Sequence, residues 1–358
     1  MLCATTSLDR QKLEEHHKVE WPVHGSSREC FCMEIVRDNL DDVLIELYKG
    51  LLAEGSANHG SRGGTVELLG VTLRVLQPRA RLSRSEDRGK PFSAIGELLW
   101  YLSGSDRLEF IEPYIKRYAD DAVGGILQGA YGPRFLKKNG SINQIQNIID
   151  LLTRKPGSRR AVIQLFDAED IATEKKEIPC TTALQFHLRD GVLHMSATMR
   201  SNDAYWGLPH DVFCFTMLQE MIARRLGAEL GNYIHHVGSM HVYDRHILAM
   251  QRYVDEGYHR PNEMPEMPSG NPLDLVPTLL GAESRIRCGE VFRAEEAIDD
   301  QYWSDIIRLV QVHWARRRGE DLSELKSTFV NSVYLPFVMP LPTERVSVFQ
   351  SDRLEMPK

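Results

Sequence analysis

One thiol, an arginine–serine pair and two carboxylates follow one another along a single stretch of this chain. The thiol is that of Cys180 in Pro179–Thr182, the pair is Arg200-Ser201, and the acids are Asp203 and Asp211. A cysteine becomes a nucleophile when nearby cations favour its thiolate form, and arginine beside serine can hold an oxyanion such as phosphate. These residue types predict nucleophilic catalysis on an anionic substrate. The alternative for a single cysteine is a buried structural side chain.

Glu97 and the pair His241/Tyr243 are further polar groups that could act in a site. Glu97 is the one acid in an apolar helical segment, and a carboxyl group placed there suits proton transfer through water; the alternative is an exposed or salt-bridged glutamate. His241 and Tyr243 lie two residues apart on a predicted strand, so they face the same side. Their alternative is an ordinary pair on a sheet surface.

Composition limits the partners of the chain. Its 358 residues are 42% hydrophobic and 26% charged, which is typical of a globular protein with a large core. The net charge of -7 argues against a general nucleic-acid binder, so no nucleic acid is required. The six cysteines have neither disulfide-framework nor zinc-site spacing. We find no signal peptide and no membrane span, which predicts a cytoplasmic protein without membrane or metal.

Hydrophobic periodicity predicts a mixture of helices and strands. Helices are expected at 35–51, 95–102, 142–152, 211–225 and 302–318, and strands at 160–166 and 233–243. A strand pair broken at Gly70 is expected in 65–76, a hairpin around Asp190-Gly191 in 183–199, and a proline-rich loop in 259–277. The fold class is α+β, with a mixed or antiparallel sheet flanked by helices. The predicted parts are an N-terminal extension 1–33, a catalytic domain 34–346 and a C-terminal tail 347–358.

The order and spacing of these motifs resemble the thymidylate synthase family, from about Ile35 to about Leu248. The resemblance implies a thymidylate synthase-like fold in a sheet-packed homodimer. It also implies a pyrimidine nucleoside monophosphate as substrate and 5,10-methylenetetrahydrofolate as cofactor.

The resemblance assigns a role to each candidate residue. Cys180 would be the nucleophile, and Glu97 and Tyr131, in Gly129–Gly132, would serve proton transfer at the pyrimidine ring. The nucleotide would be bound by Arg62 of a phosphate-binding loop, by Arg159 and Arg160 of the other subunit, by Arg200, Ser201 and Gln185, and at its 3′-hydroxyl by His241 and Tyr243. Asp203 would bind the pterin of the folate.

Asp211 is the last residue of the motif Gly207-Leu208-Pro209-His210-Asp211. Thymidylate synthases carry asparagine at this position. A carboxamide matches the O4 and N3–H of uracil. A protonated carboxyl group matches cytosine, because it accepts from the amino group and donates to N3. Aspartate therefore resembles the cytidylate or deoxycytidylate 5-hydroxymethylase branch. The alternative is that Asp211 caps the helix at 211–225.

Two more departures agree with that branch. Ile115 stands where the family has a tryptophan near the reactive methylene, and the tail from Ser347 to Lys358 lacks the family's apolar ending. A looser site would let water, rather than hydride, reach the exocyclic methylene. The first alternative function is reductive methylation of dUMP or a cytidylate. The second is a family member that binds nucleotide or RNA without catalysis. The choice between ribose and deoxyribose stays open.

Overall fold

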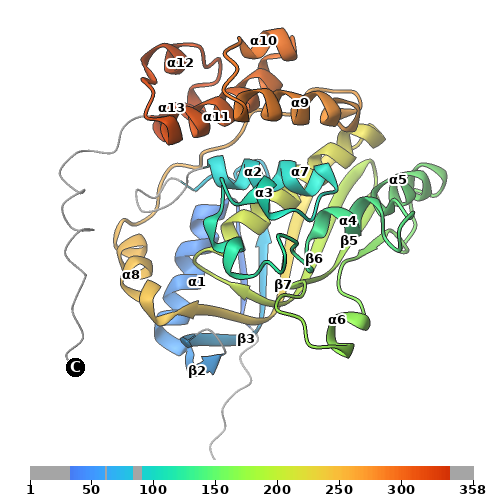
Figure 1. Ribbon diagram of the computed structural model, residues 1–358. Helices are drawn as coiled ribbons and strands as arrows, with labels where there is room; N and C mark the ends of the chain where they lie inside the picture. Colours follow the sequence, from blue (N-terminus) through green and yellow to red (C-terminus); the bar gives the residue numbers. More distant parts are fainter. Residues whose placement is uncertain (1–32, 61–62, 84–90, 339–358) are drawn as a thin grey trace, which may run out of the picture. The chain divides into compact units, whose positions relative to one another are not determined.

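The computed structural model describes residues 33–60, 63–83 and 91–338 (Figure 1). Seven strands of these residues form one sheet in the order β1-β3-β7-β6-β5-β4, with β2 paired to β3. Their bounds are β1 Glu34–Arg37, β2 Ser56–Gly60, β3 Gly63–Val75, β4 Val162–Gln164, β5 Thr181–Arg189, β6 Val192–Asp203 and β7 Glu229–Tyr243. The pairs β1/β3 and β6/β7 are parallel and the others antiparallel, so the predicted mixed sheet and α+β class are confirmed.

Helices cover one face of this sheet in successive layers. The longer helices are α1 Leu40–Glu54, α2 Pro91–Ser103, α5 Gln144–Arg154, α7 Gly207–Leu226, α8 Ile247–Asp255, α9 Val276–Arg287 and α11 Gln301–Arg318. Shorter ones are α3 Leu108–Ile111, η1 Lys116–Asp120, α4 Tyr131–Leu136, α6 Glu169–Ala172, η2 Asp244–His246, η3 Pro272–Leu275, α10 Ala294–Ala297, α12 Ser323–Ser327, η4 Ser332–Tyr334 and α13 Leu335–Val338. Helices α1 and α7 lie on the sheet, α2 packs on α7, and α9 and α11 pack on α2 (Figure 1). None of the described helices has the length and apolar character needed to cross a membrane.

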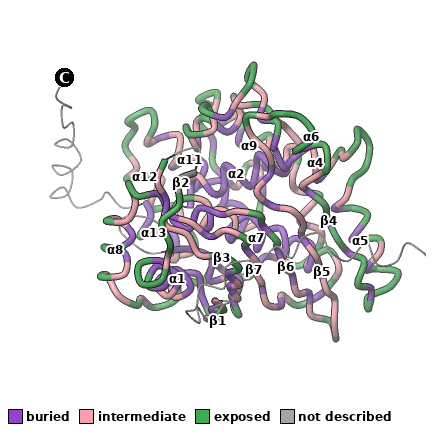
Figure 2. Tube along the Cα trace, turned by 90° about the horizontal axis from the view of Figure 1, so that it is seen from below, coloured by how far each residue is buried: buried purple, intermediate pink, exposed green. Residues whose placement is uncertain are grey.

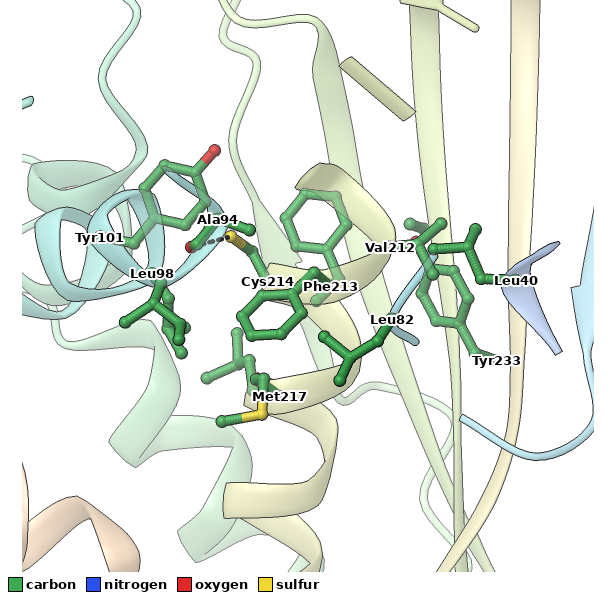
Figure 3. Packing of buried hydrophobic residues seen from close by; sticks show 14 of the residues in the cluster. Leu40, Leu82, Ala94, Leu98, Tyr101, Val212, Phe213, Cys214, Met217 and Tyr233 are labelled. Atoms are coloured by element: carbon green, nitrogen blue, oxygen red, sulfur yellow. Dashed lines mark hydrogen bonds between the residues drawn. The ribbon is translucent and has the colours of Figure 1, made fainter. Parts of the chain in front are cut away.

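The core lies between the sheet and these helices, where the buried part of the trace is concentrated (Figure 2). Figure 3 shows Leu98 of α2 and Met217 of α7 in this apolar interior, with Tyr233 projecting from β7. The Cys214 thiol donates to the Ala94 carbonyl oxygen over 3.4 Å, which joins α7 to α2. Burial of these apolar side chains is the main force that holds α2 and α7 on the sheet.

The start of α7 differs from the sequence prediction. The helix begins at Gly207 rather than Asp211, and its N-cap residue is Trp206, without a side-chain cap. Pro209 is tolerated because the N–H groups of a first helical turn have no partner within the helix. Asp211 therefore lies beyond the first turn, and the alternative that it caps this helix is wrong.

Two other element predictions need correction. Ile35 was expected at the start of a helix but lies in β1, and the helix begins only at Leu40. Residues 65–76 do not form two strands, because β3 continues through them. Gly70 has a left-handed backbone, with φ +69°, and the β3/β7 pairing keeps one register on both sides of it, with Leu69 opposite Ser239 and Val71 opposite Val237. A left-handed backbone costs glycine little, so the strand can continue through this residue.

The predicted hairpin is confirmed. Asp190 and Gly191 both have positive φ, 50° and 79°, between β5 and β6. Two left-handed residues in a two-residue loop match the twist of the flanking strands. This hairpin brings the start of β5, after Cys180, next to the end of β6, which carries Arg200.

The sheet face opposite the helices is polar and partly exposed. Along β5, β6 and β7 buried residues alternate with partly exposed ones. The second set includes Gln185, His187, His194, Ile234 and His236. This face is the one that a sheet-packed dimer would cover.

Candidate active site

A cavity of about 820 Å³ opens between the helical layer and one end of the sheet. Its volume suits a small-molecule ligand. Nine of the predicted site residues line it: Glu97, Tyr131, Cys180, Arg200, Ser201, Asp203, Asp211, His241 and Tyr243. They come from α2, α4, the loop before β5, β6, α7 and β7. The fold therefore brings together groups that lie up to about 150 residues apart in the sequence.

Arg200 is fixed beside the Cys180 sulfur by backbone carbonyls. Its Nε donates to the Pro179 carbonyl oxygen at 3.0 Å and its Nη2 to that of Ile178 at 3.3 Å. Nη2 then lies 3.6 Å from Cys180 Sγ. A cation held next to sulfur favours the thiolate, which is the nucleophilic form.

Tyr131 reaches the residue that follows the thiol. Its hydroxyl donates to Thr181 Oγ1 at 2.9 Å and accepts from the Thr181 backbone N–H at 3.0 Å. Burial raises the pKa of Tyr131 well above its ordinary value, and the nearby Asp211 and Cys180 raise it further. The phenol therefore stays protonated, and its one O–H proton is engaged with Thr181 Oγ1.

Glu97 is a buried carboxyl group on the cavity side of α2. The Tyr118 hydroxyl of η1 donates to its Oε1 over 2.5 Å. Burial and then Glu97 raise the pKa of Tyr118 well above its ordinary value, so this partner is a neutral phenol. A carboxyl group held in this way can exchange protons with water in the cavity.

Asp211 faces the same cavity and bonds to a buried amide. The Asn202 Nδ2 of β6 donates to Asp211 Oδ2 over 2.9 Å. Burial raises the pKa of the Asp211 carboxyl group well above its ordinary value, and the Glu97 carboxyl raises it further, while the Asn202 hydrogen bond opposes both. Asp211 therefore holds a proton far more readily than an exposed aspartate does.

The remaining cavity residues form a polar wall along β6 and β7. Ser201 Oγ lies 3.3 Å from His241 Nδ1, because Asp203 pairs with His241 in the parallel β6/β7 ladder. His241 and Tyr243 lie on one face of β7, as predicted, with their rings edge to face at 5.4 Å. Asp203 Oδ1 accepts from the Trp206 backbone N–H at 3.1 Å.

Four predicted residues are not placed in this cavity. Arg62 lies outside the described residues. Arg159 and Arg160 are exposed in the turn between α5 and β4, and Gln185 donates to the Arg159 carbonyl oxygen at 3.2 Å. None of these last three lines the cavity of its own chain. Their roles in nucleotide binding stay predictions.

Several residues that were not predicted from the sequence lie in or next to the site. Asn202 and His210 lie within the motifs themselves, next to residues that the family resemblance assigns. His210 Nε2 lies 2.8 Å from Ser93 Oγ, and its Nδ1 lies 2.8 Å from the Trp206 carbonyl oxygen. Both are polar side chains next to predicted site residues, a signal that could have found them. Tyr118 carries no comparable local signal, because its partner Glu97 is 21 residues away.

Comparisons with known proteins agree with this fold. The family model described as thymidylate synthase matches residues 46–270. A thymidylate synthase of Buchnera aphidicola subsp. Baizongia pistaciae is 29% identical over 231 residues, which cover 62% of this chain and 85% of the relative. A thymidylate synthase of Bacillus phage phi3T is 36% identical over 190 residues, 49% of this chain and 68% of the relative.

The fold and the site define a folate-dependent one-carbon transferase with a nucleotide substrate. The chain belongs to the thymidylate synthase family. Enzymes of this family bind a pyrimidine nucleotide and use 5,10-methylenetetrahydrofolate as their one-carbon donor, so the latter is the cofactor of this protein.

The cavity fits such a cofactor. Its wall contains the buried Asp203 carboxyl group and the indole of Trp206, which is 48% exposed. A carboxylate can accept from ring amino groups, and an exposed aromatic face can stack on a flat heterocycle. The donor set thus suits a pterin, although the role of each residue is a proposal.

Proposed function

We propose that the protein is a cytidylate or deoxycytidylate 5-hydroxymethylase. The observation that carries this proposal is the Asp211 carboxyl group, which lines the cavity with a raised pKa and one oxygen bonded to Asn202. A protonated carboxyl group donates to N3 of cytosine and accepts from its amino group. Uracil has the opposite pattern, and mispaired buried groups cost about 1–3 kcal/mol each. Because Asp211 does not cap α7, we assign base recognition to it within this proposal.

Cys180 and its neighbours supply the chemistry in this proposal. Cys180 Sγ adds to C6 of the ring, which makes C5 nucleophilic. The bound folate supplies the one-carbon unit that becomes attached to C5. The C5 proton passes to water in the cavity near Glu97 and Tyr131, and the bond between the transferred carbon and the folate nitrogen breaks, so that tetrahydrofolate leaves and an exocyclic methylene remains on C5. Asp211 stabilises the charge that develops at N3 while Cys180 is attached.

Water completes the reaction. Its oxygen bonds to the exocyclic methylene carbon and its proton passes to a cavity carboxylate. The electron pair of the methylene bond restores the ring double bond between C5 and C6, and the C6–sulfur bond breaks to release the Cys180 thiolate. Ile115, half-buried in the cavity wall, leaves more space for this water than a tryptophan would. The tail at 347–358, whose lack of an apolar ending also predicts a looser site, lies outside the described residues.

The main alternative is reductive methylation of dUMP or of a cytidylate. Both relatives described above are named thymidylate synthases, which favours this alternative for the reaction type. The Asp211 environment opposes it for the base. A non-catalytic nucleotide or RNA binder is disfavoured, because such a protein has no use for a thiol held beside Arg200 at 3.6 Å.

The experiment is a substrate panel with product identification. Purified enzyme is incubated with methylenetetrahydrofolate and, separately, CMP, dCMP, UMP or dUMP, each tritiated at C5. Tritium release separates a catalyst from a binder, and the product mass separates hydroxymethyl from methyl. Release from cytosine nucleotides with a hydroxymethyl product supports the proposal. Release from dUMP alone, with a methyl product, contradicts it. The panel also decides between ribose and deoxyribose.

A further inference from the structure

A chain of buried polar groups runs from the cavity into the core. It begins at Asp211 on α7, continues through Asn202 on β6, and ends at His235 and Tyr233 on β7. Asn202 Nδ2 lies 2.9 Å from Asp211 Oδ2 and 3.1 Å from His235 Nε2. His235 Nδ1 lies 2.6 Å from the Tyr233 hydroxyl. Both His235 and Tyr233 are inaccessible to solvent.

His235 is neutral in this chain. Burial lowers the pKa of its imidazole to about 3, with a smaller contribution from His236. A neutral imidazole has one donor and one acceptor nitrogen. Because Nε2 faces an amide N–H of Asn202, Nε2 is the acceptor, and Nδ1 carries the proton and donates to the Tyr233 oxygen. The tautomer of a buried histidine is thus set by its two partners.

With Nε2 as an acceptor, His235 is one of the groups that hold the nitrogen side of the Asn202 amide. Its nitrogen faces three acceptors, namely Asp211 Oδ2, His235 Nε2 and the Met199 sulfur at 2.8 Å. Its oxygen is buried and has no hydrogen-bond partner among the described residues. A buried acceptor left unpaired is costly. The orientation is retained because the surrounding acceptors hold the nitrogen.

Gly207 leaves room for this arrangement. A Cβ atom at Gly207 would lie 3.1 Å from Asn202 Oδ1 and 3.6 Å from Asp211 Oδ2. The first distance is tighter than ordinary van der Waals contact, so a side chain here would press on the amide. The glycine at the start of α7 therefore lets Asn202 and Asp211 approach each other.

The amide in turn decides where Asp211 keeps its proton. Oδ2 accepts from Asn202, so the proton belongs on Oδ1, which is then able to donate to a ligand. If the amide were turned over, its oxygen would face Asp211 Oδ2. The carboxyl proton would then be shared with Asn202 instead of the base.

We propose that His235 is a positioning residue for base recognition, which acts through Asn202 to direct the Asp211 proton towards the nucleotide base. This role rests on the proposed function of Asp211. His235 does not line the cavity, so it acts only through the residues between.

The test compares two substitutions at His235. His235→Phe removes the acceptor and keeps a ring of similar size, whereas His235→Gln returns an amide oxygen near the Nε2 position. His235→Phe is expected to lower the cytosine-to-uracil ratio of kcat/KM about tenfold or more, the effect of one misdirected hydrogen bond. His235→Gln should keep most of the ratio. Thermal melting verifies that both variants fold, and Asn202→Leu breaks the same link should His235→Phe fail to fold.

A second readout does not depend on turnover. Infrared difference spectra, referenced to Asp211→Asn, report the carbonyl stretch of a protonated Asp211 when CMP or dCMP binds. The signal should change position in His235→Phe and return in His235→Gln. An unchanged ratio and an unchanged carboxyl signal in folded His235→Phe overturn the role of His235. A wild-type enzyme that prefers uracil nucleotides contradicts the proposed function instead, and the spectra then still judge His235.

Discussion

At the scale of a single residue, substitution of Cys180 tests whether the reaction is covalent. Cys180→Ala should abolish turnover and tritium release from C5, because Cys180 is the one cysteine among the described residues that line the cavity. Nucleotide binding should persist, since the rest of the cavity wall is unchanged. Isothermal titration with nucleotide and a tritium-release assay measure the two effects. Cys214→Ala, in the core rather than the cavity, is the matched control for loss of a thiol. Near-normal turnover by Cys180→Ala would exclude the covalent step.

Substitution of Asp211 tests whether this residue selects cytosine over uracil. Asp211→Asn replaces the protonated carboxyl group by an amide, which matches O4 and N3–H of uracil. The ratio of kcat/KM for cytosine over uracil nucleotides should fall at least about tenfold, with measurable new activity on a uridylate. Steady-state kinetics with matched nucleotide pairs provide the ratio. If it stays the same in both proteins, Asp211 does not read the base.

The same residue should make stability depend on pH. Above the ordinary pKa of aspartate and up to the raised value, folded Asp211 holds a proton that the unfolded chain has released. Unfolding then releases a proton, so the free energy of unfolding falls as pH rises through this window. Asp211→Asn removes this loss and should be stabilised relative to wild type as pH increases. Asp190→Asn, in the exposed hairpin turn, is the control and should follow wild type in denaturant titrations. A pH profile for Asp211→Asn parallel to that of wild type would contradict the raised pKa.

Helix α11 lies beyond the region that matches the family model, which ends at residue 270. We expect it to contribute to the stability of the fold. Its Trp303, 3% exposed, belongs to the core where α11 packs on α2, the helix that carries Glu97. Trp303→Ala should lower the free energy of unfolding by about 3–5 kcal/mol, because a large buried ring is lost. Leu248→Ala, at a 75% exposed site, should change it by less than about 0.5 kcal/mol. Chemical denaturation measures both, and equal effects would mean that α11 is not part of the core.

The elements also show how far the sequence could lead. Helices α1, α2 and α11 were predictable because their apolar residues recur at helical spacing, and the β5/β6 hairpin because Asp190-Gly191 fits a tight turn. The start of α7 was mispredicted, since Gly207 and Pro209 normally mark a loop rather than a helix.

The site also contains residues that were predictable from the sequence and residues that were not. Residues within the motifs, such as Cys180 and Arg200, were predictable from type and spacing, and the fold brings them together. The link from Asn202 to His235 was not, because it joins side chains of two strands 33 residues apart and no local period reports such a pair. The tautomer of His235 depends on three-dimensional neighbours alone.

At the scale of the whole molecule, the partly exposed face of the sheet and the exposed Arg159 and Arg160 favour a homodimer with shared sites. Both arginines lie away from the cavity of their own chain, where a phosphate would need forked donors. We expect Arg160 of one protomer to complete the phosphate site of its partner across a two-fold interface.

Subunit mixing tests this arrangement with two inactive proteins. A Cys180→Ala chain lacks the nucleophile, and an Arg160→Ala chain lacks the phosphate contact, so each homodimer should be inactive or nearly so. In a mixed dimer, one site receives Cys180 from the second chain and Arg160 from the first, while the other site has neither. Random exchange makes half of the dimers mixed, each with one intact site, so about a quarter of wild-type activity should return. Activity should return only after the two proteins have exchanged subunits, and sedimentation should show that they are dimers. No recovery in verified mixed dimers, or an active monomer, would place the whole phosphate site within one chain.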